Sequence, residues 1–217
     1  LTQPAMSAAA PLFAMPSPFA TENGQVLLLE PPEASAGELR ARLLDESYAR
    51  PFVVDDGQQR FLYFSVRLMQ SAMSLRAPND LELRYTQKMM AFLLFHPRPK
   101  RIVLIGLGGG SLLKFCYHRL PGAQLTAVEV DPDVIALRDI FLLPPDGPLL
   151  QIVHADGASY LDQSEKGIDV LLVDAFDKSG FAPKLANREF FASAFASLSG
   201  KGVMVVNLAG ERESYAG

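Results

Sequence analysis

A run of four aliphatic residues, Ile102–Ile105, leads directly into the glycine-rich segment Gly106-Leu107-Gly108-Gly109-Gly110-Ser111. Such an apolar run is typical of a parallel strand that is buried on both faces of a sheet. Because glycine lacks a Cβ, the segment that follows can turn sharply and let a ligand approach the backbone closely. A helix is expected from there to about Leu120, and amides at its N-terminus favour polar or anionic ligand groups. The sequence therefore predicts a strand, a glycine turn and a helix in series, which opens an α/β fold.

The rest of the chain after residue 101 alternates between short apolar runs and helical segments. Helices are expected at about 133–141, from 158 onward, and at 187–198, where Gly200 would close the last one. Asp131 and Pro132 fit the N-cap and the first turn of the first of these helices. Further strands are expected at 125–130, 150–154, 168–174 and 203–208. Strands alternating with helices favour right-handed crossovers and predict a doubly wound, mostly parallel sheet.

The sequence before this sheet differs in composition and in its pattern of apolar residues. Residues 1–24 are rich in small residues and proline and predict a flexible leader. Residues 25–80 predict a small N-terminal β-rich domain with a short helix at 38–48, because the runs 51–55 and 60–67 flank an Asp-Asp-Gly turn as in a β-hairpin. Residues 81–217 form the expected nucleoside-binding α/β domain, which opens with a helix at 81–95. This domain is expected to lack its C-terminal helix and hairpin, because the sequence stops soon after the fifth strand.

The composition excludes several classes of protein. A net charge of −4 argues against a nucleic-acid surface, which needs clustered Lys and Arg. No apolar run approaches the length of a membrane span. The single cysteine excludes a cysteine-based zinc site, and the three histidines are not spaced as ligands, so no metal is expected. We expect a cytoplasmic protein with no membrane or nucleic-acid partner.

The acidic residue Glu129 ends the second strand, 23 residues after Gly106, where a carboxylate can accept hydrogen bonds from ribose hydroxyls. A dinucleotide-binding turn reads G-x-G-x-x-G, whereas the sixth position here is Ser111. The spacing of Gly106, Gly108 and Gly110 matches the G-x-G-x-G of proteins that bind an adenosyl sulfonium and need no room for a pyrophosphate. We therefore expect an adenosyl sulfonium rather than NAD, on a Rossmann-like fold of the class I methyltransferase type. A glycine turn kept only for packing is the alternative.

Further acids follow the third and fourth strands. Asp156 and Gly157 follow the third strand, and Asp156 either accepts a hydrogen bond from an adenine amino group or caps the next helix. Asp174 and Asp177 follow the fourth strand, where two carboxylates beside a cleft indicate a cationic ligand. Asp174 is the candidate base for an attacking amine, and Asp177 would anchor its charge. The alternative is a solvated Asp174 and a loop-capping Asp177.

These motifs resemble those of the polyamine aminopropyltransferases, the spermidine and spermine synthase family. The resemblance covers about residues 50–208 and rests on R-I-V-L-I-G-L-G-G-G (101–110), A-V-E-V-D-P (127–132), H-A-D-G-A-S-Y-L (154–161) and D-V-L-L-V-D-A-F-D (169–177). It continues into L-A-N-R-E-F-F (185–191), which looks like the family's gatekeeping loop. Tyr85 matches a substrate-contacting tyrosine of the family, and Gln70 matches a glutamine that precedes it.

The resemblance implies transfer of an aminopropyl group from decarboxylated S-adenosylmethionine to a small amine such as putrescine. In that role Glu129 would hold the ribose, Asp156 the adenine and Asp174 the attacking amine. It also implies a homodimer, for which the apolar stretch 89–95 and the edge of the small β-domain are the candidate surface.

Two departures from the family pattern leave other functions open. The family usually reads G-G-G-D-G after the first strand, with an aspartate that pairs with the donor ammonium, and Gly109 stands at that position here. The family's D-S-S-D-P appears as D-A-F-D-K, so that Phe176 and Lys178 replace a small residue and a proline. A methyltransferase that uses S-adenosylmethionine itself, or a nucleoside-binding paralogue without activity, are therefore the alternatives.

Overall fold

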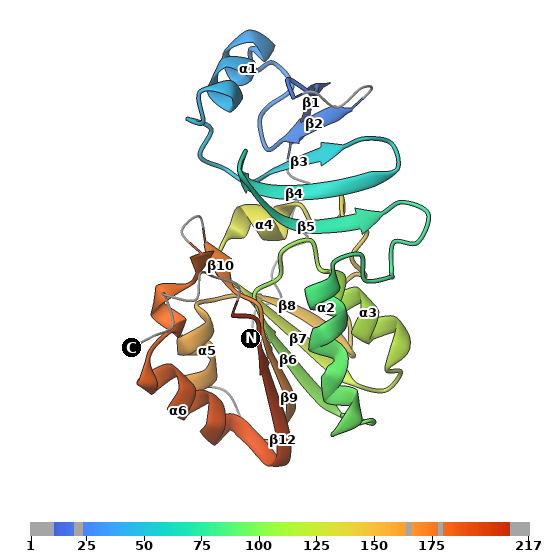
Figure 1. Ribbon diagram of the computed structural model, residues 1–217, viewed down its shortest axis with the longest axis vertical. Coiled ribbons are helices and arrows are strands. Elements are labelled where there is room, and N and C mark those ends of the chain that lie inside the picture. Colours follow the sequence, from blue (N-terminus) through green and yellow to red (C-terminus); the bar gives the residue numbers. More distant parts are fainter. Residues whose placement is uncertain (1–10, 20–23, 164–165, 178–179, 209–217) are drawn as a thin grey trace.

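A computed structural model of the chain describes residues 11–19, 24–163, 166–177 and 180–208. The described chain forms two five-stranded sheets, one above the other in Figure 1, and a small two-stranded sheet. The upper, antiparallel sheet belongs to the N-terminal part of the chain, and the lower, parallel sheet to the rest. The predicted α/β class with a small N-terminal β-sheet is confirmed.

The small sheet has the strand order β1-β2-β3-β4-β5. Its strands are Phe13–Pro16 (β1), Gln25–Leu28 (β2), Phe52–Asp55 (β3), Gln59–Ser65 (β4) and Leu68–Ser74 (β5). The predicted hairpin is confirmed as β3 and β4, and the Asp55 carboxylate accepts a hydrogen bond from the Gly57 amide in its turn. The prediction of a leader over 1–24 is wrong at β1, which pairs with β2 because Met15 faces the core beside Val26. The helix α1, Ala36–Leu44, packs Leu39 and Leu43 into the same cluster.

The larger sheet has the strand order β12-β9-β6-β7-β8, and all its pairs are parallel. Its strands are Arg101–Ile105 (β6), Gln124–Glu129 (β7), Leu150–His154 (β8), Ile168–Val173 (β9) and Leu198–Val206 (β12). The order reverses beside β6, so the crevice where ligands of open α/β sheets bind lies at the carboxyl end of this strand. The doubly wound sheet is therefore confirmed.

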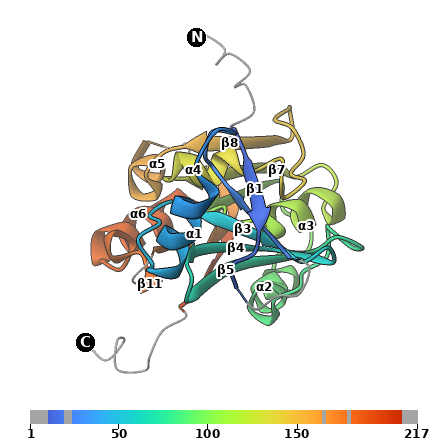
Figure 2. The same ribbon diagram turned by 90° about the horizontal axis from the view of Figure 1, so that it is seen from above.

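Alternate side chains of β6 enter separate cores on the two faces of the sheet. Ile102 and Leu104 pack with α2 and α3, whereas Val103 and Ile105 pack with α5 and α6. Figure 2 shows these two pairs of helices on opposite sides. The helices are Arg84–Met89 (α2), Ser111–Arg119 (α3), Pro132–Ala136 (α4), Gly157–Gln163 (α5) and Arg188–Ser197 (α6). This double coverage explains why the strand sequence is continuously apolar.

Several predicted boundaries are wrong. The helix expected at 81–95 is split into α2 and the 3-10 helix η1, Met90–Leu94. The helix expected at 133–141 stops after α4, although Asp131 caps it as predicted by accepting from the Asp133 amide. Gly200 lies inside β12 and does not close α6, whose C-cap is Leu198 in an extended conformation. The short strands Phe176–Asp177 (β10) and Gly180–Phe181 (β11), the 3-10 helix Pro183–Leu185 (η2) and β5 were not predicted.

The segment from α4 to Leu143 joins the two sheets. Arg50 of the small domain donates to both carboxylate oxygens of Asp133, with distances of 2.8 and 2.7 Å, and also to the Leu29 carbonyl. Arg60 donates to the Ile140 carbonyl at 2.5 Å and pairs with Asp55 at 2.7 Å. Two arginines therefore attach the small sheet to the segment that follows β7.

Candidate active site

A cavity of about 520 Å³ lies between the carboxyl edge of the larger sheet and strands β4 and β5 of the small one. It brings together most of the site residues that the sequence predicts, namely Gln70, Tyr85, Gly106, Gly108, Glu129, Asp156, Gly157 and Asp174. Gly110 does not line the cavity. Segments far apart in the sequence thus meet at the carboxyl end of β6, where the strand order of the sheet reverses.

The glycine turn after β6 brings the cavity floor close to the end of β9. Gly106 has a φ of +95°, and a Cβ at this position would lie 2.2 Å from the Asp174 carbonyl oxygen. Gly108 and Gly110 also have positive φ values, and Gly110 packs against Leu143. The turn is therefore required both for its own backbone conformation and for contact with the strand that carries Asp174.

Glu129 is the buried acid at the end of β7. Its two carboxylate oxygens accept hydrogen bonds from the amides of Leu107, at 2.8 Å, and Asp131, at 2.9 Å. Burial raises the pKa of Glu129, and these amide donors oppose the rise. The carboxylate is thus tied to the glycine turn while it lines the cavity, which is the position expected for a ribose ligand.

Asp156 makes the helix-capping contact that was one of its two predicted roles, and its predicted contact with adenine stays a prediction. One oxygen of its carboxylate accepts from the amide and the hydroxyl of Ser159, at 3.0 and 3.1 Å, which stabilises the start of α5. The same side chain lines the cavity. The Ser159 amide lowers the pKa of Asp156, and the nearby Lys184 acts in the same direction. Gly157 is packed so closely that an added Cβ would lie 2.4 Å from Ile105 Cγ2.

Asp174 is held by two neutral groups from distant parts of the chain. The Tyr85 hydroxyl donates to one carboxylate oxygen at 3.2 Å, and the Asn207 amide donates to the other at 2.9 Å. Burial raises the pKa of both Asp174 and Tyr85. Within the described ranges no cation forms an ion pair with Asp174.

Asn207 is a site residue that the sequence analysis missed. It follows β12, and its amide nitrogen donates to the Val173 carbonyl, next to Asp174. Its position one residue past an apolar strand, at the same edge as Asp174, is the signal that would have found it.

Some of the residues after β9 that were predicted to bind the attacking amine lie outside the part of the chain that the structure describes. The backbone of Asp177 belongs to β10 and pairs with Gly180, but its side chain is outside the described part of the molecule. Lys178 lies entirely outside the described residues. Phe176 and Lys184 line the cavity on this side.

Comparison with known proteins decides which family this site belongs to. The sequence profile of the spermine/spermidine synthase domain matches residues 82–211, which is more than half of the chain. The chain belongs to the spermine/spermidine synthase family. Among curated relatives of the family, the polyamine aminopropyltransferase of Chromobacterium violaceum is 40% identical over 169 residues, which cover 77% of this chain and 65% of the relative. That of Neisseria meningitidis serogroup A is 36% identical over 170 residues, with the same coverage.

Solved structures of family members share the fold. A probable spermidine synthase from Corynebacterium glutamicum is 19% identical, covers 74% of this chain and 61% of its own, and gives a TM-score of 0.63. A spermidine synthase in complex with the transition-state analogue AdoDATO is 22% identical, covers 72% and 54%, and gives a TM-score of 0.58. Human methyltransferase-like protein 13 in complex with SAH, at 22% identity and 61% and 68% coverage, gives 0.55. The class I methyltransferase-like fold is thus shown.

The family resemblance is limited in length. The match spans 65% of the length of both curated relatives quoted above, which is less than two thirds. In the described ranges no group of three or more His, Cys, Asp or Glu side chains is placed to hold a metal ion. Nor does any helix in those ranges have the length and apolar character needed to cross a bilayer.

Proposed function

We propose that this protein transfers an aminopropyl group from decarboxylated S-adenosylmethionine to a small amine such as putrescine and releases methylthioadenosine. The observation that carries the proposal is the partly buried carboxylate of Asp174, which is held by Tyr85 and Asn207 in the same cavity as Glu129. The name of the relatives, polyamine aminopropyltransferase, supports the same activity.

The nucleoside half of the donor fits the end of the cavity formed by β7 and β8. Glu129 offers a buried carboxylate to the ribose hydroxyls, and Asp156 offers one to the adenine amino group. Apolar side chains of Ile105, Val128 and Leu185 also line the cavity and suit the faces of a purine and a sugar. This arrangement supports an adenosyl compound as the donor substrate.

Asp174 supplies the proton acceptor for the attacking amine. The carboxylate first pairs with the ammonium form and then takes one of its protons, which frees the nitrogen lone pair. The nitrogen forms a bond to the propyl carbon beside the sulfonium as the carbon–sulfur bond breaks, and the electron pair of that bond leaves with sulfur. The leaving group is already activated, so alignment and exclusion of water supply most of the remaining rate enhancement.

The test is the product formed from decarboxylated S-adenosylmethionine and a panel of diamines, measured by mass spectrometry. The expected product is the amine with one aminopropyl group added, together with methylthioadenosine. Asp174→Asn keeps the size of the side chain and should abolish turnover, whereas the control Asp162→Asn, at an exposed position on α5, should not. Absence of product with every amine, or full turnover by Asp174→Asn, would contradict the proposal.

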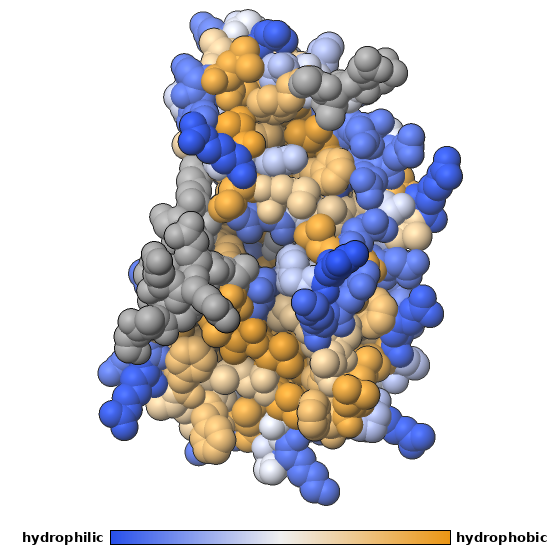
Figure 3. All heavy atoms as spheres, in the orientation of Figure 1, coloured by the Kyte–Doolittle hydropathy of each residue, from blue (hydrophilic) through white to orange (hydrophobic). Residues whose placement is uncertain are grey.

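We also propose a cytoplasmic homodimer. The single cysteine, Cys116, is buried and free, as expected for a reducing compartment. At the end of η1, Leu94 and Phe95 are 83% and 76% exposed. Figure 3 shows apolar side chains gathered on the lower half of the face in view. Light scattering should give twice the chain mass, and Phe95→Glu should shift the mass toward the monomer. A monomeric parent protein would refute this second proposal.

A further inference from the structure

A turn of the chain after α4 packs against the glycine turn, and we call its residues 137–143 the backing turn. A Cβ added at Gly109 would lie 3.0 Å from the Phe141 ring, and one added at Gly110 would lie 2.7 Å from the Leu143 side chain. Two glycines of the turn are thus fitted closely to side chains of one segment. The conformation of the glycine turn therefore depends on where the backing turn is held.

Two basic side chains hold the end of the backing turn. Its backbone leaves the helical conformation at Leu142, which has a positive φ of +55°. Carbonyls at such an end have no partner within the turn and can accept from basic side chains. Here the Ile140 carbonyl accepts from Arg60 of β4 at 2.5 Å, and the Phe141 carbonyl accepts from Lys114 Nζ of α3 at 2.7 Å. The backing turn is thus attached both to the small sheet and to the helix that follows the glycine turn.

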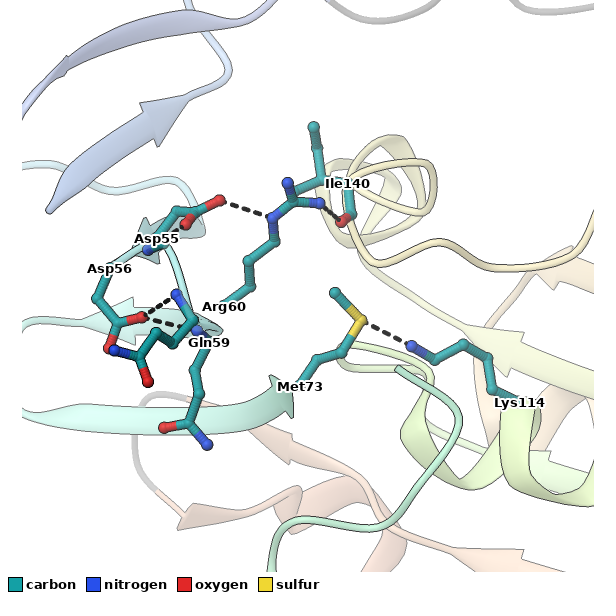
Figure 4. A network of polar contacts seen from close by, with 9 residues as sticks. Asp55, Asp56, Gln59, Arg60, Met73, Lys114 and Ile140 are labelled. Atoms are coloured by element: carbon teal, nitrogen blue, oxygen red, sulfur yellow. Dashed lines mark hydrogen bonds and ion pairs between the residues drawn. The ribbon is translucent and has the colours of Figure 1, made fainter. Parts of the chain in front are cut away.

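Lys114 carries a fully buried ammonium group. Besides the Phe141 carbonyl, its Nζ contacts Met73 Sδ of β5 at 2.8 Å (Figure 4). It forms no ion pair in the described part of the chain, and burial lowers the pKa of Lys114 to about 8, so most of the population is cationic at neutral pH. A buried charge without a counter-ion is costly, and a methionine of similar length would fill the same space without that cost. The charge therefore points to a role beyond packing.

Three segments that border the glycine turn meet at the Lys114 ammonium. They are α3, which directly follows the glycine turn, the backing turn, and β5. On β5, Met73 follows the cavity residues Gln70 and Ser71. Ser71 is only 6% exposed, its hydroxyl makes no hydrogen bond to another described residue, and its Oγ would lie 2.7 Å from a Cβ added at Gly109. A shift of the ammonium would therefore move the glycine turn and this wall of the cavity together.

We propose that Lys114 is a positioning residue, whose ammonium fixes the glycine turn against the backing turn and β5 and thereby aligns the donor with the amine at Asp174. Lys114 is not among the residues that line the cavity, so it acts through Gly109 and Ser71. Gly106 of the same turn packs against the Asp174 backbone, so a displaced turn changes the distance between the two substrates. Their reacting atoms must lie about 3–3.5 Å apart and in line. The role in catalysis rests on the proposed function.

Hydrogen exchange followed by mass spectrometry tests whether Lys114 fixes the turn. In Lys114→Met the backbone amides of residues 106–112 should exchange about tenfold faster than in the parent protein, because a hydrogen bond from a charged group is lost. Amides of β9 should keep the exchange rate of the parent protein. The control Lys88→Met, at an exposed lysine of α2, should change neither rate. Unchanged exchange of residues 106–112 in Lys114→Met would refute the positioning role.

The kinetics of aminopropyl transfer test the role in catalysis. The kcat of Lys114→Met should fall by about 10- to 100-fold through misalignment. Its Kd for methylthioadenosine, measured by calorimetry, should stay within about threefold of the parent value, because Glu129 and Asp156 remain in place. Phe141→Leu keeps the carbonyl that accepts from Lys114 and removes the ring from Gly109, so it should lower kcat in the same way. The double variant should lose little more than the larger single loss, because both changes act through one contact.

Two kinetic results would overturn the role in catalysis: a kcat of Lys114→Met within about twofold of the parent value, or equal losses of kcat and of nucleoside affinity, which would indicate general disruption. If Lys114→Met does not fold, the same measurements on Phe141→Leu decide. Transfer by the parent protein combined with either result refutes the inference alone. Absence of transfer with every amine refutes the proposed function, and hydrogen exchange of residues 106–112 then still decides whether Lys114 fixes the glycine turn.

Discussion

Replacement of Gly106 by alanine should destabilise the protein more than the same replacement at Gly57. Both glycines have positive φ values, +95° and +83°, so an alanine costs about 1–2 kcal/mol of backbone strain at either position. At Gly57 nothing lies within 4 Å of the added Cβ, whereas at Gly106 the Cβ would lie 2.2 Å from the Asp174 carbonyl oxygen. Overpacking of this kind adds about 1–3 kcal/mol. We therefore expect a loss of about 1–2 kcal/mol for Gly57→Ala and about 2–5 kcal/mol for Gly106→Ala.

Urea unfolding of both variants and the parent protein measures these losses. A thermal scan should show the same order, since 1 kcal/mol corresponds to about 2–4 °C in a chain of this size. Equal losses for the two variants would refute the reasoning, because they would mean that the glycine turn does not touch the end of β9. A Gly106→Ala protein as stable as the parent would also refute the requirement for positive φ.

Three further predictions concern binding, pH and the contact between the two sheets. Glu129→Ala should weaken methylthioadenosine binding by about 1–3 kcal/mol in calorimetry, because it removes charge-assisted hydrogen bonds, and an unchanged affinity would contradict this role. Since burial raises the pKa of Asp174, kcat/KM should increase as the pH rises through that pKa. Tyr85→Phe removes a hydrogen bond to the carboxylate, so the increase in kcat/KM should move to higher pH. A move to lower pH would contradict the assignment of Asp174 as the base. Arg50→Met should lower the free energy of unfolding in urea by about 1 kcal/mol, and Arg67→Met, at an exposed ion pair, by much less; equal effects would exclude a stabilising contact between the sheets.

The larger sheet was predictable because its signals are local. The apolar run of β6 is buried on both faces, and the glycines and Glu129 follow strands at fixed places. For the same reason Glu129, Asp156 and Asp174 line one cavity, since parallel strands bring their carboxyl ends to one edge.

The errors arose where tertiary contacts override local patterns. Gly200 was taken for the end of a helix, yet it lies inside β12 because pairing with β9 begins at Leu198. β1 was missed because its only strong signal is Met15, which needs the facing Val26 to be buried.

The hydrogen-bond partners of the site residues could not be predicted from the sequence either. No local pattern relates Asn207 to Asp174, because the contact depends on the pairing of β12 with β9. The unpartnered hydroxyl of Ser71 and the burial of Lys114 likewise depend on how the small sheet meets the glycine turn.

The arginine contacts between the small sheet and the segment after β7 have a consequence for how ligands enter. Arg50 donates hydrogen bonds to Asp133, and Arg60 donates one to the Ile140 carbonyl. Both acceptors belong to the segment whose Phe141 packs against the glycine turn. A hinge motion that moved the small sheet away would have to break both arginine contacts and would displace the segment that packs against the glycine turn. We therefore expect substrates to come and go without the two halves of the molecule separating, past the part of the cavity lined by Phe176, Ala182 and Lys184.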